Sequence, residues 1–236
     1  MATRQLDLLL SSGFLGFARH LGFLKAVQDA GVSFDAVVGT SSGAVIGALV
    51  AAGHGWEHIR SLFGALPPIR YFALSSRPWA GTCTLRPLMR VLERELPARF
   101  DELASPLGLG VCSADGSHHL ITHGDLRQAV IASCSVPRLC VPTALNGHRY
   151  ADGGAVDRVG VAAWRRWRPD RSAILHRIER RFGVEPPAEL QGVFSVDSPR
   201  SRASLLSWRD FDSQMAESAS LTERRLPLLF GPNGTT

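Results

Sequence analysis

Short apolar runs alternate with helix-like segments along the first fifty residues of the chain. Residues 6–10 form a short, largely apolar run that ends in Ser-Ser-Gly, the pattern of a buried parallel strand that enters a tight turn. Apolar residues recur at helical spacing over 16–30, a second buried strand is predicted over 34–38, and a helix of small and apolar residues over 45–52. This β-α-β-α order predicts a parallel sheet with helices on its faces.

The rest of the chain continues the same alternation. The pattern predicts strands over 107–113, 119–122, 174–178 and 193–196, and helices over 85–96, 126–134 and 211–224. No internal repeat, low-complexity run or long linker divides the sequence. A chain of 236 residues can bury one sizeable core, so we expect residues 1–236 to form a single α/β domain.

Composition favours a globular protein over a disordered one, because 45% of the residues are hydrophobic and the mean hydropathy is +0.04. The longest apolar run is too short, and too interrupted by glycine, to span a bilayer. The first residues lack an A-x-A-like cleavage site, which favours a first strand over a signal peptide. We therefore expect a cytoplasmic protein, either free or peripheral at membranes.

The net charge of +5 suits anionic partners such as phospholipid surfaces or nucleic acid. The basic residues are almost all arginines, and they are scattered except in the cluster 164–168, which is typical of a solvated surface. No nucleic acid partner is therefore predicted. Two aromatic segments are candidates for contact with lipid, as alternatives to ordinary packing: Trp164 and Trp167 at a headgroup interface, and residues 67–79 as a lip over a site.

The cysteines give no sign of a metal site. Their spacing contains no C-x-x-C and no metal-ligand arrangement with a histidine, and free thiols in a reducing compartment explain them most simply. They are Cys83, Cys112, Cys134 and Cys140. No metal and no cofactor are expected.

A glycine-flanked serine stands where the second predicted strand meets the second predicted helix. In Gly39-Thr40-Ser41-Ser42-Gly43 a buried strand must reverse sharply, and the glycines tolerate the close approach and the unusual dihedral angles of such a turn. The turn would hold the Ser41 hydroxyl outward, beside helix N–H groups that favour an oxyanion. A G-x-S-x-G pattern alone often arises by chance, but its position directly after a strand favours a nucleophile over a structural turn.

A nucleophilic hydroxyl needs a base, and one acidic residue stands out. Asp152 precedes Gly153 and Gly154 after a short extended segment, although an Asp-Gly pair is also a common signal for a hairpin turn. Both interpretations remain open on this evidence alone. Segment 11–16, between the first strand and the first helix, is where backbone N–H groups could face a substrate carbonyl beside Ser41. The same segment also resembles a degenerate dinucleotide-binding loop.

In this order, the three elements resemble the patatin-like phospholipase family, which has a G-x-G-x-x-G loop, then G-x-S-x-G, then a distant D-G-G or D-G-A. The similarity extends over nearly the whole chain and is clearest over residues 20–53 and 130–154. It implies a three-layer α/β/α fold with a mostly parallel central sheet. It also implies a Ser-Asp dyad that acts without histidine on acyl esters of lipids, through an acyl-enzyme intermediate.

The resemblance assigns roles to individual positions. They are the nucleophile Ser41, the base Asp152, the oxyanion residues Gly13 and Phe14, the nucleophile-turn glycines Gly39 and Gly43, and the aspartate-turn glycines Gly153 and Gly154. Ser11 and Ser12 stand where the family's loop has its first two glycines, and residues 155–160 replace its frequent Asn-Pro. We expect a lipid acyl hydrolase, a phospholipase A or an esterase, whose lipid substrate is presented at a membrane surface or micelle.

Two other functions compete with this one. An α/β-hydrolase would use Ser41, Asp152 and His176 as a triad, but that fold normally places several strands before its nucleophile, and here one strand and one helix precede it. The alternating pattern around His176 also favours a structural histidine. A non-catalytic lipid-binding or regulatory member is the other alternative, suggested by the altered loop and opposed by the intact serine and aspartate. The head group, the acyl chain and the oligomeric state are left open.

Overall fold

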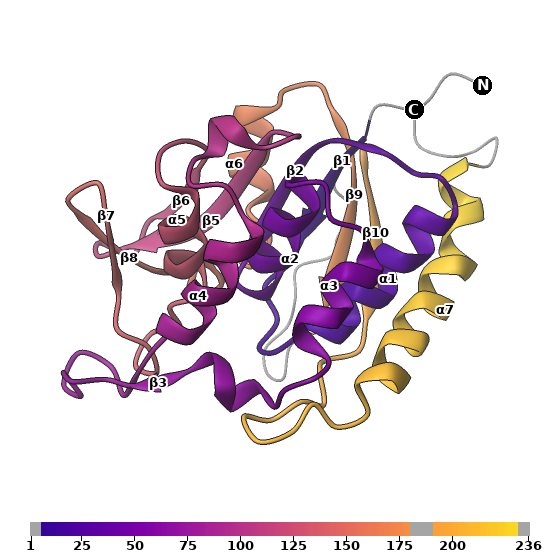
Figure 1. Ribbon diagram of the computed structural model, residues 1–236. Coiled ribbons are helices and arrows are strands. Elements are labelled where there is room, and N and C mark those ends of the chain that lie inside the picture. The colour runs from indigo at the N-terminus through magenta and orange to yellow at the C-terminus, as the bar shows by residue number, and fades with distance from the viewer. Residues whose placement is uncertain (1–5, 180–190, 231–236) are drawn as a thin grey trace.

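A mostly parallel sheet lies at the centre of the computed structural model, which describes residues 6–179 and 191–230 (Figure 1). Within these residues the sheet has eight strands. They are β1 (Leu6–Leu10), β2 (Phe34–Thr40), β5 (Leu107–Ser113), β6 (His118–Ile121), β7 (Thr143–Leu145), β8 (His148–Asp152), β9 (Ser172–Ile178) and β10 (Val193–Ser198). A separate pair consists of β3 (Ala73–Leu74) and β4 (Cys83–Thr84).

The strand order is β10-β9-β1-β2-β5-β8-β7, and β6 also pairs with β5. The run from β10 to β5 is parallel, whereas β6, β7 and β8 pair antiparallel. Parallel neighbours need crossover connections, and helices supply them between β1 and β2 and between β2 and β5. The predicted α/β class is therefore confirmed.

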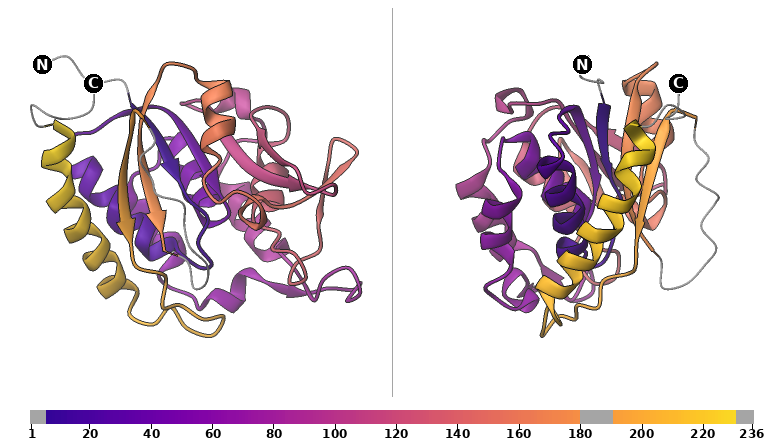
Figure 2. Two further views of the ribbon diagram at one scale, coloured as in Figure 1. Left: turned by 180° about the vertical axis from the view of Figure 1, so that it is seen from behind. Right: turned by 90° about the vertical axis from the view of Figure 1, so that its right-hand side faces the viewer.

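Helices cover both faces of the sheet, which makes three layers (Figure 2). The larger core places Leu8 and Leu10 of β1 against α1 and α2, and the smaller core places Leu9 against Trp164 of α6. Because side chains alternate along a strand, β1 contributes to both cores and has apolar side chains on both faces of the sheet. The helices are α1 (Phe17–Asp29), α2 (Ser42–Ala51), α3 (Trp56–Phe63), α4 (Arg86–Glu95), α5 (Leu126–Ser133), α6 (Val161–Trp167) and α7 (Phe211–Phe230).

The predicted elements are all present, with shifted ends. Strand β2 continues to Thr40, α2 already begins at Ser42, and α7 continues to Phe230. Pattern reasoning missed α3, α6 and the hairpin of β7 and β8. A two-residue turn at Asn146 and Gly147, both with positive φ, closes that hairpin, and the Asn-Gly pair was the available signal.

Of the two alternatives for Trp164, the headgroup interface is wrong and ordinary packing is confirmed. Its side chain is fully buried, and its indole N–H donates to Asp7 Oδ2 at 2.8 Å. Trp167 is partly buried and packs against the same smaller core. Arg168 forms an ion pair with the buried Asp7 at 3.1 Å, so this arginine of the basic cluster neutralises a charge in the interior. Within the described residues, no helix is both long and apolar enough to cross a membrane.

Candidate active site

Ser41 occupies a strained turn between β2 and α2. Its backbone has φ 57° and ψ −121°, in a region that residues other than glycine seldom adopt. A Cβ atom at Gly39 would lie 2.2 Å from the Gly43 carbonyl oxygen, and one at Gly43 would lie 2.4 Å from the Leu10 carbonyl oxygen. Both positions therefore require glycine, because the start of α2 packs directly on β1 and β2.

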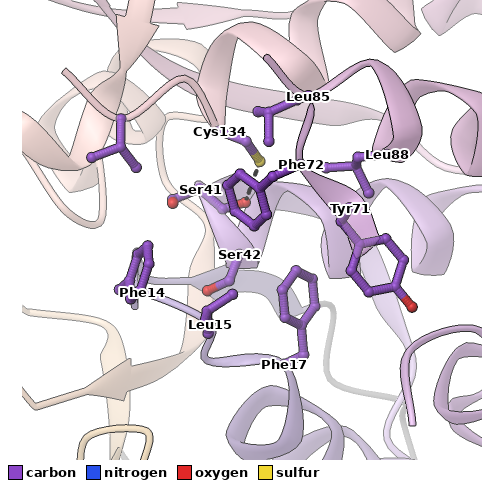
Figure 3. A pocket seen from close by; sticks show the side chains of 11 residues that line it. Phe14, Leu15, Phe17, Ser41, Ser42, Tyr71, Phe72, Leu85, Leu88 and Cys134 are labelled. Carbon is purple, nitrogen blue, oxygen red and sulfur yellow. Dashed lines mark hydrogen bonds between the residues drawn. The ribbon is translucent and has the colours of Figure 1, made fainter. Parts of the chain in front are cut away.

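The backbone of Ser41 is held by two residues that sequence analysis did not single out. The Ser41 N–H donates to Ser133 Oγ at 3.0 Å, and the Ser133 hydroxyl donates to the Gly110 carbonyl at 2.7 Å. The Cys134 thiol donates to the Ser41 carbonyl at 3.2 Å (Figure 3). Both backbone groups of Ser41 are thus hydrogen-bonded to the end of α5, which holds the main chain of the turn in place.

The sheet register brings Asp152 next to this turn. Thr40 of β2 pairs with Gly110 of β5, and Asp152 of β8 pairs with the next residue, Val111. Strand β6 pairs with residues 109–112 and so occupies the other edge of β5. Strands β2 and β8 therefore share one edge of β5, end to end. Ser41, which directly follows β2, and Asp152, which ends β8, therefore come together there.

The Asp152 carboxyl group is 5% exposed, and its Oδ1 accepts a hydrogen bond from the Gly154 N–H at 2.8 Å. Burial raises the pKa of Asp152 to about 6, against the opposing effects of hydrogen bonds from the Ser41 hydroxyl and the Gly154 amide and of the nearby Arg158 charge. The following residues form a 3₁₀ turn, not a hairpin. A hairpin turn at this Asp-Gly pair is thus excluded.

The two glycines after Asp152 allow close packing. A Cβ atom at Gly153 would lie 2.6 Å from the carbonyl group of Gly110, and one at Gly154 would lie 2.4 Å from Ser12 Oγ. The second contact places the turn after Asp152 directly against the loop that follows β1. Three segments that are distant in sequence therefore meet at one point.

Ser11 and Ser12 anchor that loop. The Ser11 hydroxyl accepts from the Ile178 N–H at 2.9 Å, and the Ser12 N–H donates to the Arg158 carbonyl at 2.7 Å. The Arg158 guanidinium in turn donates to the Ser12 carbonyl at 2.6 Å. In the described part of the chain, the N–H groups of Gly13 and Phe14 have no hydrogen-bond partner. The serines thus fix the loop and leave the next two amides available.

An apolar pocket opens beside Ser41 (Figure 3). Phe14 stands at one side of it, and Phe72, from the segment predicted as a lip, lies in front of Ser41. The hydroxyl oxygen of Ser42 is buried without a hydrogen-bond partner in the described residues. The lining residues are Phe14, Leu15, Phe17, Ser41, Ser42, Tyr71, Phe72, Leu85, Leu88, Cys134 and Val136.

His176 does not join the serine and the aspartate. Its imidazole is fully buried, its Nδ1 lies 2.8 Å from His20 Nδ1, and its Nε2 lies 2.9 Å from Ser198 Oγ. The ring also stacks on Phe23. Burial lowers the pKa of His176 well below its ordinary value. These contacts account for both ring nitrogens and give the histidine a structural place beneath the loop that follows β1.

A family model described as "Patatin-like phospholipase" matches residues 8–163, a span that runs from β1 through Ser41 and Asp152. The chain belongs to the patatin-like phospholipase family. The predicted resemblance is therefore confirmed, and the strand-turn-serine arrangement described above is the form that the family's matched region takes in this chain.

Family relatives include an uncharacterised NTE family protein of Mycobacterium tuberculosis, 24% identical over 173 residues, which cover 64% of this chain and 43% of that protein. A neuropathy target esterase of Drosophila persimilis is 28% identical over 179 residues, 65% of this chain and 11% of that protein. The chain thus spans less than half the length of these curated relatives.

Two solved structures share the fold. The crystal structure of VipD from Legionella pneumophila superposes with a TM-score of 0.60 at 13% identity, covering 96% of this chain and 66% of that one. The type III effector protein ExoU gives a TM-score of 0.58 at 14% identity, covering 94% of this chain and 52% of that one. At such low sequence identity, these similarities support a shared fold only.

Proposed function

We propose that this protein is a serine lipid acyl hydrolase, a phospholipase A or an esterase, that works through a dyad of Ser41 and Asp152. The observation that carries the proposal is the end-to-end arrangement of β2 and β8 on β5, which brings a strained serine and a buried carboxyl group together. Membership of the patatin-like phospholipase family supports the substrate class.

The dyad would act in two steps. With a pKa of about 6, Asp152 is largely ionised at neutral pH and accepts the Ser41 proton while Oγ attacks the ester carbonyl. Collapse of the tetrahedral intermediate breaks the ester bond, and the proton passes from Asp152 to the leaving alcohol. Water then attacks the acyl-serine with the same carboxylate as base, which releases the fatty acid and regenerates Ser41.

The loop after β1 supplies the N–H groups that would stabilise the oxyanion. The amides of Gly13 and Phe14, unpartnered in the described residues, are the donors that we assign to the developing oxyanion. Ser11 and Ser12 take the places of flexible glycines, but their side chains and backbone tie the loop to Ile178 and Arg158, and so preserve its position. This argues against the alternative of a non-catalytic member.

A lipid surface is the proposed site of action. Several large apolar side chains lie exposed, with Leu74 93%, Trp79 83% and Leu206 78% accessible, and Leu74 follows closely on the pocket residue Phe72. Two segments carry them, at the bottom of Figure 1, and a hydrogen bond from the Ile69 N–H to the Leu205 carbonyl at 2.7 Å joins these segments. Residues 58–92 contain five arginines and no acidic residue, and one of these arginines, Arg60, pairs with Asp212 at 2.8 Å. Exposed apolar groups with surrounding cations suit an anionic phospholipid bilayer.

Labelling and turnover test the proposal together. A fluorophosphonate should label wild-type protein at Ser41, and Ser41→Ala should abolish both labelling and hydrolysis of a p-nitrophenyl acyl ester. The matched control is Ser42→Ala, which removes a hydroxyl that has no partner in the described residues and should cost less than tenfold. Equal loss in both variants would show that the turn, and not the Ser41 hydroxyl, matters.

A second measurement addresses the lipid surface. The rate on one ester substrate should rise when its concentration crosses the critical micelle concentration, and Trp79→Ala should weaken this rise while leaving hydrolysis of the monomeric ester unchanged. A smooth hyperbola through that concentration would contradict action at an interface but would leave the dyad untouched.

A further inference from the structure

Two histidines and a glutamate converge on the surface where α3 and α4 approach each other, and none of them lines the pocket. His54 lies in the turn before α3, His58 lies within α3, and Glu95 is the last residue of α4. His58 Nε2 is 2.7 Å from Glu95 Oε2, and His54 Nε2 is 3.9 Å from the same oxygen. One donor atom from each residue lies within 4.8 Å of the others.

We infer that His54, His58 and Glu95 form a binding site for a divalent transition-metal ion, and that Zn²⁺ fits this donor set best. Imidazole nitrogen and carboxylate oxygen are both good zinc ligands, and two histidines with one glutamate leave a fourth tetrahedral position for water. In such a site, with bonds of about 2.0–2.2 Å, neighbouring donors lie about 3.4 Å apart. The separations of 2.7 and 3.9 Å fall on either side of that value, so a small movement of the Glu95 side chain equalises them.

The Nε2 protons of His54 and His58 do not prevent metal binding. Without an ion, the His58 Nε2–H donates to the Glu95 carboxylate, and the His54 Nε2–H donates to the Glu95 main-chain oxygen at 2.9 Å. A neutral imidazole can carry its proton on Nδ1 instead of Nε2. This tautomer leaves Nε2 free to bind the metal, and the ring stays neutral. The two rings lie face to face, with centroids 4.6 Å apart, and binding one ion requires them to rotate so that both Nε2 atoms point toward it.

A bound ion would join the beginning of α3 to the end of α4. Leu88, near the other end of α4, lines the pocket, so the ion would secure a helix that shapes the candidate active site. No metal was predicted, because the spacing of the cysteines gave no sign of a site. The sequence signal was the His-x-x-x-His spacing of residues 54 and 58. This inference does not depend on the proposed function.

Calorimetric titration of the full chain with Zn²⁺, after treatment with a chelator and dialysis, tests the site. We expect one ion per chain with a dissociation constant on the order of micromolar, and visible absorption bands of tetrahedral Co²⁺ when cobalt replaces zinc. His58→Ala and Glu95→Gln should each weaken binding at least about tenfold, because each removes one of three ligands. His123→Ala, an exposed histidine outside the cluster, should bind as wild type does.

The same titration can overturn the inference. No heat of binding at about 100 μM Zn²⁺ would do so, since that concentration is far above the expected dissociation constant. Equal binding by wild type, His58→Ala and Glu95→Gln would also do so, because the ion would then sit elsewhere. His58 is half-exposed, so its alanine variant should fold, and circular dichroism of each variant checks this.

Discussion

Asp7 and Asp152 are both buried at strands of the same sheet, but they have different partners. The Asp7 carboxylate on β1 accepts hydrogen bonds from the Trp164 indole and from the Arg168 guanidinium, at 2.8 to 3.2 Å. The Asp152 carboxyl group on β8 accepts hydrogen bonds from the Gly154 amide and the Ser41 hydroxyl and, in the part of the chain that is described, forms no ion pair.

This difference in partners separates a structural carboxylate from a reactive one. A direct cation offsets the cost of removing the Asp7 charge from water, and the resulting pair fastens α6 to the sheet. Asp152 has no such cation in contact, so burial dominates and its pKa rises to about 6. A carboxyl group that is destabilised as an anion at neutral pH is a better proton acceptor, which is what the proposed dyad needs.

The largest expected effect is on catalysis. Asp152→Asn should lower kcat/KM for an acyl ester by about 10²–10⁴-fold or more, because the amide cannot accept the Ser41 proton. Asp7→Asn should leave kcat/KM of the folded protein within about threefold of wild type. A similar loss of activity in both variants, with both folded, would abolish the distinction between the two aspartates.

The next effect is on stability, and here Asp7→Asn is the variant that we expect to be affected. Asp7→Asn leaves the Arg168 guanidinium without its carboxylate, so we expect the free energy of unfolding to fall by about 3 kcal/mol at pH 7. Urea denaturation of the variant and of wild type measures this. An unchanged midpoint would show that the buried pair contributes little to the fold.

An effect of similar size on stability depends on pH. Asp152 binds its proton more tightly in the folded state, so its contribution to stability is complete below its unfolded pKa and is lost as the pH rises through about 6. That loss amounts to about 3 kcal/mol. Asp152→Asn cannot titrate there, so its stability relative to wild type should rise by up to that amount between pH 4 and pH 7.5. Parallel stability curves would contradict the raised pKa.

The smallest effect appears in the pH dependence of the rate. Because the base must be ionised, kcat/KM should fall about tenfold for each pH unit below about 6 and level off above it. His148→Ala, which removes an exposed histidine of β8, should leave this profile in place. A profile whose inflection moved in that variant would indicate a histidine as the base.

Local patterns in the sequence determined a good part of this protein. The turn around Ser41 was predictable because a buried strand, two glycines and a helix of small residues all lie within about fifteen neighbouring positions, and the conformation depends on those neighbours alone. The alternation of strands and helices was predictable for the same reason. Asp152 was recognisable only as an aspartate before two glycines, with a hairpin turn as an equal alternative.

The tertiary structure decided which of these residues meet. Strand β8 continues the edge of β5 where β2 ends, and no pattern within either strand specifies that register. The same placement buries Asp152 and raises its pKa, whereas Asp7, which looked like one polar residue in an apolar run, receives an arginine from α6. The surroundings of a charge depend on which distant segments pack around it, so the chemistry of these two identical side chains is set by the fold.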